Sequence, residues 1–197
     1  MNLPNKLTLS RFVLTVGFMV VMFSRVRLHE TIALLLFSAA GISDFLDGQI
    51  ARRRKLITNF GILMDPLADK IMVCSAFIAF VDLKWIPSWM VVIIVARELA
   101  ITGLRLLAAS KNLVLAAEGF GKHKTISQIV AILAILVEHS YRDWGGFGTA
   151  IFGLHIVLDR PWVEWFTEVS KWVAVGLTFV SGWIYLWKNR QLYLEDL

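Results

Sequence analysis

The sequence has little of what a secreted or soluble domain relies on. It contains one cysteine, Cys74, so no disulfide can form within the chain. Only 18% of its 197 residues are charged while 57% are hydrophobic, a composition outside the range of ordinary soluble domains. The N-terminus lacks the charged start, apolar core and cleavage site of a removable signal peptide. Since we find no internal repeat and no low-complexity tract, we expect one domain over residues 1–197.

Long apolar stretches dominate the chain instead. Each is close to the roughly 20 residues that a helix needs to cross a bilayer. There are six, at about 8–24, 31–50, 61–82, 86–109, 124–139 and 165–187. They predict an all-α, polytopic membrane protein with six transmembrane helices. The Gly-rich segment 145–159 is too short for a seventh span, and we expect it to be interfacial or re-entrant.

Lysine and arginine are distributed unequally between the two sides of the predicted bundle. Eleven of them, including Arg11, Lys124 and the cluster at 52–55, fall on the side that carries both termini, and five fall on the other. The positive-inside rule therefore places the termini and the loop at 52–60 in the cytoplasm. The net charge of +5 then reflects topology and attraction to anionic lipid rather than nucleic-acid binding.

Four aspartates, Asp44, Asp47, Asp65 and Asp69, are out of place in such apolar surroundings. An ionised carboxylate in the middle of a bilayer costs about 2.5 to 3.5 kcal/mol, so four uncompensated ones would cost roughly 10 kcal/mol. In an antiparallel hairpin connected at 52–60, Asp47 and Asp65 would lie about 8 Å from the helix ends, and the other two about 12 Å. Spacings of three and four residues place each pair on one helix face. The four carboxylates are therefore predicted to converge.

Convergent carboxylates repel one another unless a cation neutralises them. Mg²⁺ and Mn²⁺ prefer hard oxygen ligands, and the absence of cysteine and histidine from this run argues against structural zinc. Gly48 and Gly61 leave space beside the carboxylates, and Arg52 offers a fork of donors that suits a diphosphate. Each of these residues alone could be a packing glycine or a topology arginine. Together with the aspartates they indicate a metal-dependent phosphate site.

The order Asp44-x2-Asp47-Gly48-x2-Ala51-Arg52-x8-Gly61-x3-Asp65-x3-Asp69 resembles the signature of the CDP-alcohol phosphotransferases, integral membrane enzymes of phospholipid synthesis. Three further segments, residues 4–11, 96–98 and 121–125, are similar to the bacterial branch of that family whose acceptor is glycerol 3-phosphate. The resemblance covers about residues 2–139.

This resemblance implies a six-helix fold around a polar cavity open to the cytoplasm, usually as a homodimer, in the bacterial inner (cytoplasmic) membrane. The implied reaction transfers a phosphatidyl group from CDP-diacylglycerol to glycerol 3-phosphate and releases CMP. Asp44, Asp47 and Asp65 would bind two ions of Mg²⁺ or Mn²⁺, and Asp69 would be the general base and a further metal ligand.

The same resemblance implies which residues contact the nucleotide. An interfacial segment at about 2–9 would lie over the nucleotide site. The CDP contacts would come from Asn5, Thr8, Gly48, Ala51 and Arg52.

The dianionic phosphate of the acceptor needs cations besides the metal. Arg97 and Arg105 are eight residues apart, which places them about 80° apart around one helix and about 12 Å apart along it. Lys122 and Lys124 come just before the fifth stretch, where the N-terminal amides of a helix also favour an anion. We predict that Arg105, Lys122 and Lys124 hold the phosphate. Arg97 is a fourth candidate, and its alternative role is to pair with Glu98.

Two other functions are compatible with these residues. One is the same chemistry with a different acceptor, such as inositol phosphate or serine. The other is a divalent-cation transporter, because carboxylates inside a membrane also mark ion pathways. Transporters commonly contain inverted repeats and broken helices in matching halves, and this chain has neither. The membrane enzyme is the favoured interpretation.

Overall fold

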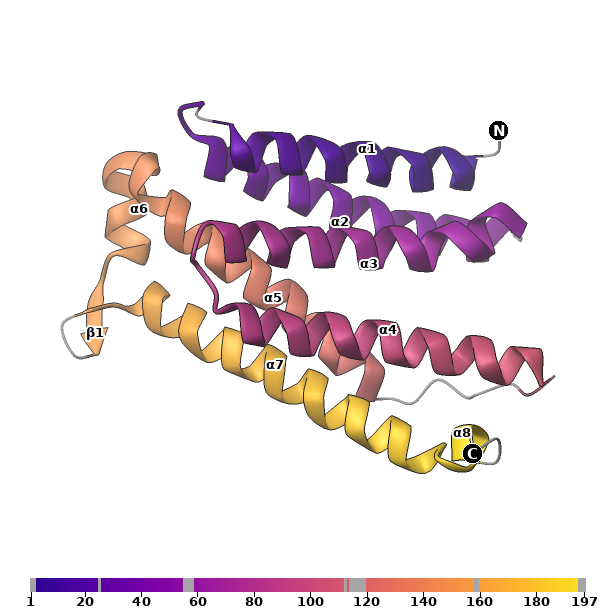
Figure 1. Cartoon of the computed structure of the whole chain (residues 1–197). Helices are drawn as coiled ribbons and strands as arrows, with labels where there is room; N and C mark the ends of the chain where they lie inside the picture. Colours follow the sequence, from indigo (N-terminus) through magenta and orange to yellow (C-terminus); the bar gives the residue numbers. More distant parts are fainter. Residues whose placement is uncertain are drawn as a thin grey trace.

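Six long helices form a bundle in the part of the chain that the structure describes (Figure 1). They are α1 (Leu3–Phe23), α2 (His29–Arg54), α3 (Asn59–Asp82), α4 (Ser88–Ser110), α5 (Phe120–Ser140) and α7 (Trp162–Lys188). The computed structural model describes residues 3–24, 26–54, 59–111, 113, 120–157 and 160–194. Within these ranges, side chains are not described for 3–7, 44–54, 59–63, 65, 66, 120–122, 156, 157 and 194.

Each predicted apolar stretch coincides with one of these helices, but several bounds differ. Helix α2 continues to Arg54 and α3 begins at Asn59, so fewer residues separate the two helices than the predicted connection at 52–60. Helix α5 begins at Phe120, four residues before the predicted stretch. Residues 3–9 of the predicted N-terminal segment are continuous with the rest of α1, so that segment is not a separate helix.

The Gly-rich segment after α5 folds into short elements. The 3-10 helix η1 (Tyr141–Trp144) leads into α6 (Gly145–Phe152), and the strands β1 (His155–Val157) and β2 (Arg160–Pro161) pair antiparallel before α7 begins. A Cβ on Gly148 would lie 2.0 Å from the carbonyl oxygen of Tyr141, so only glycine fits there. These elements lie at one end of the bundle (Figure 1). The chain termini and the short α8 (Gln191–Leu194) lie at the other end.

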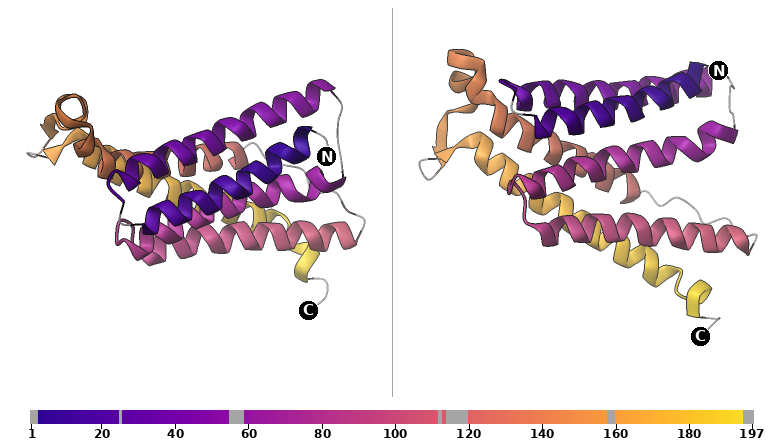
Figure 2. Two further views of the ribbon diagram at one scale, coloured as in Figure 1. Left: turned by 90° about the horizontal axis from the view of Figure 1, so that it is seen from above. Right: turned by 45° about the horizontal axis from the view of Figure 1, so that its top comes forward.

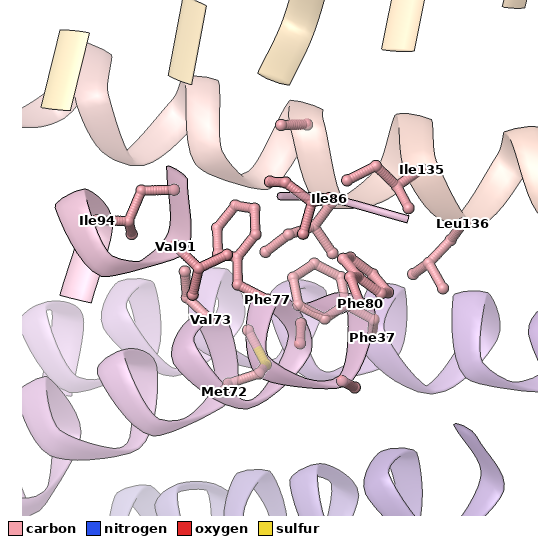
Figure 3. Close-up of a cluster of buried hydrophobic side chains, with 14 of the residues drawn as sticks. Phe37, Met72, Val73, Phe77, Phe80, Ile86, Val91, Ile94, Ile135 and Leu136 are labelled. Atoms are coloured by element: carbon pink, nitrogen blue, oxygen red, sulfur yellow. The ribbon is translucent and has the colours of Figure 1, made fainter. Parts of the chain in front are cut away.

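The core lies where α3 and α5 pack against their neighbours (Figure 3). Phe77 and Phe80 of α3 are fully buried, and their rings meet edge to face with centroids 6.4 Å apart. Ile135 and Leu136 of α5 are buried in the same cluster. Such close packing and ring geometry hold the helices at a fixed separation.

The outside of the bundle is apolar as well. Val13, Val16 and Val20 follow one face of α1 and are all exposed, which is unusual for a protein surrounded by water. Among the described residues, Trp162–Lys188 is long and apolar enough to cross a membrane as it stands, and Thr8–Phe23 and His29–Ser43 are shorter apolar helices. The views in Figure 2 show that the long helices share one approximate direction.

A tight turn joins α3 to α4. Lys84 has a left-handed conformation with a φ of 61°. The Trp85 N–H donates to the Phe80 carbonyl at 2.8 Å, and the Lys84 N–H donates to the Val81 carbonyl at 3.0 Å, which is the Schellman pattern that usually contains glycine at the left-handed position. The turn directs the Trp85 ring onto His139 of α5, with the ring centroids 3.7 Å apart.

Candidate active site

The bounds of α2 and α3 place the four aspartates at two matched depths. Helix α2 ends, at Arg54, and α3 begins, at Asn59, at the same end of the bundle, as the two labelled helices show (Figure 1). Counted from these two residues, Asp47 and Asp65 are about 10 Å along their helices, and Asp44 and Asp69 about 15 Å. The aspartates therefore still pair by depth. Their distances from the helix ends are slightly larger than those expected for a connection at 52–60.

Asp69 has its described partner on α1. Arg11 donates from Nη1 to Asp69 Oδ1. The Arg11 side chain is only 1% exposed, whereas that of Asp69 is 47% exposed. Because burying an unpaired guanidinium is costly, the ion pair fixes α1 against α3. Arg11, which belongs to the predicted set of cytoplasmic charges, is therefore a buried partner of the candidate base.

The next residue of α3, Lys70, points to a different neighbour because consecutive helical residues are about 100° apart. Lys70 donates to Thr102 Oγ1 of α4, and Thr102 Oγ1 donates to the Glu98 carbonyl at 2.7 Å. On the same helix the Glu98 carboxylate accepts from Lys124 of α5. Glu98 and Lys124 are both buried. These contacts join α3, α4 and α5 through polar side chains inside the bundle.

Two arginines of α4 lie on the side that faces α7. Arg97 Nη1 lies 3.5 Å from Glu98 Oε1, so the alternative of pairing with Glu98 is what the structure shows. Arg105 Nε donates to the Tyr185 hydroxyl at 3.4 Å, and its guanidinium carbon lies 5.8 Å from the centre of the Tyr185 ring. No contact among the described residues joins Arg105 to Lys124.

Among the side chains that the structure describes, positive charge exceeds negative charge around Glu98. In this cluster Arg97 and Lys124 pair with the Glu98 carboxylate, and the third cation, Lys70, contacts Thr102 on the same helix as Glu98. One carboxylate cannot neutralise three cations, and charges inside an apolar bundle require compensation. The arrangement therefore suits a bound anion of more than one negative charge, beside the helix that carries Asp69.

A model of the CDP-alcohol phosphatidyltransferase family matches residues 1–182. The chain belongs to this family. A relative from Bacillus subtilis (strain 168), named CDP-diacylglycerol–glycerol-3-phosphate 3-phosphatidyltransferase, is 40% identical over 200 residues, which cover 95% of each chain. Relatives with the same name come from Rickettsia typhi, 31% identical over 93% of this chain and 94% of the relative, and from Mycoplasma pneumoniae, 34% identical over 98% and 88%. The predicted family is confirmed.

Several residues of the phosphatidyltransferase signature lie outside the described side chains. This is the case for Asp44, Asp47, Gly48, Ala51, Arg52 and Asp65, and also for Asn5 and Lys122. Among the described side chains, which include only Asp69 of the four aspartates, no group of three or more His, Cys, Asp or Glu could hold a metal ion. Thr8, one turn before Arg11, is fully buried. The metal and CDP contacts stay predictions.

Three residues of the site were not predicted from the sequence to belong to it. They are Arg11, Lys70 and Glu98. Glu98 carries the clearest signal, since a carboxylate in an apolar helix requires a partner. The partner of such a residue cannot be read from the sequence, because Lys124 lies 26 positions away.

Proposed function

We propose that this phosphatidyltransferase moves a phosphatidyl group from CDP-diacylglycerol to glycerol 3-phosphate and releases CMP. The observation that carries this proposal is the excess of positive charge among the described side chains around Glu98, next to the aspartate-bearing helix α3. A dianionic phosphate on the acceptor would balance that charge. The names of the relatives from three bacteria support the same acceptor.

The proposed setting is the bacterial inner membrane, with six spanning helices and a polar cavity open to the cytoplasm. The six long helices and the exposed apolar face of α1 support it. So does the excess of lysine and arginine on the side of the termini. A homodimer is part of the proposal, and the molecular mass in detergent would test it.

The four aspartates fit a divalent cation. Their carboxylate oxygens are the ligands that Mg²⁺ and Mn²⁺ prefer, and the Asp69 side chain is half exposed. We propose that Asp44, Asp47, Asp65 and Asp69 hold two such ions. When bound, the ions would supply positive charge against the diphosphate and the leaving CMP.

Asp69 is the proposed general base. The acceptor hydroxyl oxygen forms a bond to the phosphorus that carries the diacylglycerol, the bond between that phosphorus and CMP breaks, and the hydroxyl proton passes to Asp69. A base must be held within hydrogen-bond reach of that proton. The ion pair with buried Arg11 gives Asp69 a fixed position from which to act.

The acceptor phosphate would be held by Arg97, Arg105, Lys122 and Lys124. Lys70 joins this proposed set, because it reaches α4 beside Glu98. Glu98 keeps Arg97 and Lys124 together before the phosphate arrives. Charge-assisted hydrogen bonds to phosphate are about twice as strong as neutral ones, so binding would favour the phosphate-bearing acceptor.

The CDP moiety would lie against α1 and the end of α2. Asn5 and Thr8 of α1 are the proposed cytidine contacts. Gly48, Ala51 and Arg52 of α2 would line the diphosphate, where the absence of a side chain on Gly48 lets the ligand approach the backbone.

The test is an assay of the purified protein in detergent with CDP-diacylglycerol and a panel of acceptors. We expect CMP release and a phosphatidylglycerophosphate product with glycerol 3-phosphate, in the presence of Mg²⁺ or Mn²⁺, and none after EDTA treatment. Release with serine or inositol phosphate instead would reassign the acceptor. No release with any acceptor would reject the proposed reaction.

A further inference from the structure

Helix α7 packs against Arg97 of the polar cluster at Gly182. A Cβ placed on Gly182 would lie 2.7 Å from Arg97 Cγ and 3.7 Å from Arg97 Cβ. The first distance is far shorter than real carbon contacts allow. The other glycine of α7, Gly176, has no atom within 4 Å of the same ideal position among the described residues. The side chain of Arg97 therefore occupies the space that a residue at 182 would fill.

The space left by the missing side chain of Gly182 determines the position of the Arg97 guanidinium. The stem of Arg97 lies against Gly182, and its Nη1 lies 3.5 Å from the Glu98 carboxylate. The side chain is 13% exposed, and among the described atoms its buried Nε has no hydrogen-bond partner. A buried donor without a partner is unfavourable, and an oxygen of a bound anion would satisfy it.

An apolar groove of about 300 Å³ lies over the same contact. It is lined by residues of both helices, among them Ala96 and Ala100 of α4 and Phe179 and Trp183 of α7. If Arg97 were pushed from its place beside Gly182, its stem would have room in this groove. The guanidinium would then leave Glu98.

We propose that Gly182 is a positioning residue for the acceptor phosphate: by leaving space on α7 it holds the Arg97 guanidinium beside Glu98 and Lys124, ready to bind that phosphate. The inference rests on the proposed function, because it takes Arg97 to be a phosphate ligand. It assigns the last helix a part in acceptor binding, although that helix carries none of the aspartates.

The substitution Gly182→Ala tests this, with Gly176→Ala as the matched control on the same helix. We expect Gly182→Ala to raise the acceptor KM about tenfold, because small displacements of a binding group are costly, and to change the CDP-diacylglycerol KM less than twofold. Gly176→Ala should change neither. Equal effects of the two substitutions, or an unchanged acceptor KM in Gly182→Ala, would overturn the inference.

A double-mutant cycle with Arg97→Ala decides whether Gly182 acts through Arg97. In the Arg97→Ala background, Gly182→Ala should have no further effect on the acceptor KM. If Gly182→Ala alone does not fold, the double variant should recover the melting temperature of Arg97→Ala, since the clash is gone. A double variant that stays unstable, or a full second loss of acceptor affinity, would contradict the inference.

A binding measurement separates this inference from the proposed reaction. Glycerol 3-phosphate, and inorganic phosphate at higher concentration, should raise the melting temperature of the wild-type protein and of Gly176→Ala, and at the same concentration that of Gly182→Ala much less. If the wild type binds phosphate in this way but forms no product, the proposed reaction fails and the role of Gly182 stands. If phosphate stabilises Gly182→Ala as much as the wild type, the role of Gly182 fails.

Discussion

The two ends of this bundle are held together by different chemistry. The half nearer the chain termini contains ion pairs and polar contacts between helices, such as Arg11 with Asp69 and Lys124 with Glu98. The opposite end relies mainly on aromatic rings, and its buried ion pair, Lys171 with Glu168, lies within α7. Trp85 stacks on His139 at 3.7 Å, and Phe152 stacks on Trp162 at 5.8 Å.

This difference separates function from stability. Buried ion pairs contribute little net stability, because desolvation offsets much of their attraction. Aromatic pairs add about 0.5 to 1.5 kcal/mol beyond the area that they bury. Charges inside an apolar bundle are therefore most simply explained by a ligand, and the aromatic end by the need to hold six helices in place. Making the same type of substitution at both ends of the bundle tests whether one end serves function and the other stability.

The largest effect is expected for Asp69→Asn. Loss of the general base should lower kcat by about 10²- to 10⁴-fold, while the amide can still accept a hydrogen bond from Arg11 and so keep its place beside α1. Asp82→Asn, at the other end of the same helix α3, is the matched control and should leave kcat unchanged. Turnover retained in Asp69→Asn would remove it as the base.

The next effect is expected for Lys124→Met, which keeps an unbranched side chain, one atom shorter, and removes its charge. The acceptor KM should rise by about 10- to 100-fold, because a charge-assisted bond to phosphate is lost. The CDP-diacylglycerol KM should change much less.

Lys171→Met is the control at the aromatic end. Lys171 is as buried as Lys124, with both side chains 7% exposed, and it is likewise paired with a carboxylate, that of Glu168. Its loss should lower the melting temperature and leave both KM values unchanged. Equal kinetic effects of the two lysine substitutions would abolish the distinction between the two ends.

A smaller effect is expected for Tyr185→Phe, which removes the hydroxyl that accepts from Arg105. One neutral acceptor is worth about 1 kcal/mol, so the acceptor KM should rise by about threefold to fivefold. Tyr141→Phe is the control at the aromatic end. It removes a hydroxyl that accepts from Arg142 Nε at 3.1 Å. Steady-state kinetics of Tyr141→Phe should match those of the wild type, and a change there would indicate that the ends are coupled.

The smallest effect is expected for Lys84→Gly. Lys84 has a φ of 61° in the turn between α3 and α4, and glycine adopts this conformation without a steric penalty. The free energy of unfolding should rise by less than about 1 kcal/mol, since glycine also gains freedom in the unfolded chain. The measurement is thermal unfolding in detergent, and kcat and both KM values should not change. A destabilised Lys84→Gly would show that the Lys84 side chain itself holds the turn.

Much of the architecture was predictable from local patterns. The six apolar stretches became six helices, with bounds that moved by a few residues, as at α5, which begins at Phe120. The matched depths of the aspartates were also predictable, since they depend only on rise per residue and on the position of one connection. The bounds of α2 and α3 changed the depths by a few ångströms and kept the pairing.

The partners of the charged residues were less predictable. Arg97 was expected either to bind phosphate or to pair with Glu98, and the structure shows the pairing. Lys124 was expected in the phosphate clamp, and it is also bound to Glu98. From the sequence, Arg11 was counted among the cytoplasmic charges that orient the protein, but it is buried against Asp69. In each case the sequence identifies a charge that needs compensation, without identifying the partner.

The sequence by itself determined the helices, the motif order and the family, because helix formation and hydrophobic periodicity depend on residues close together in the chain. The tertiary structure alone decided that Arg11 meets Asp69, that Glu98 holds Lys124 and that Gly182 makes room for Arg97. Those contacts join residues 26 to 85 positions apart. They depend on how the helices pack and rotate against one another, which no local pattern specifies.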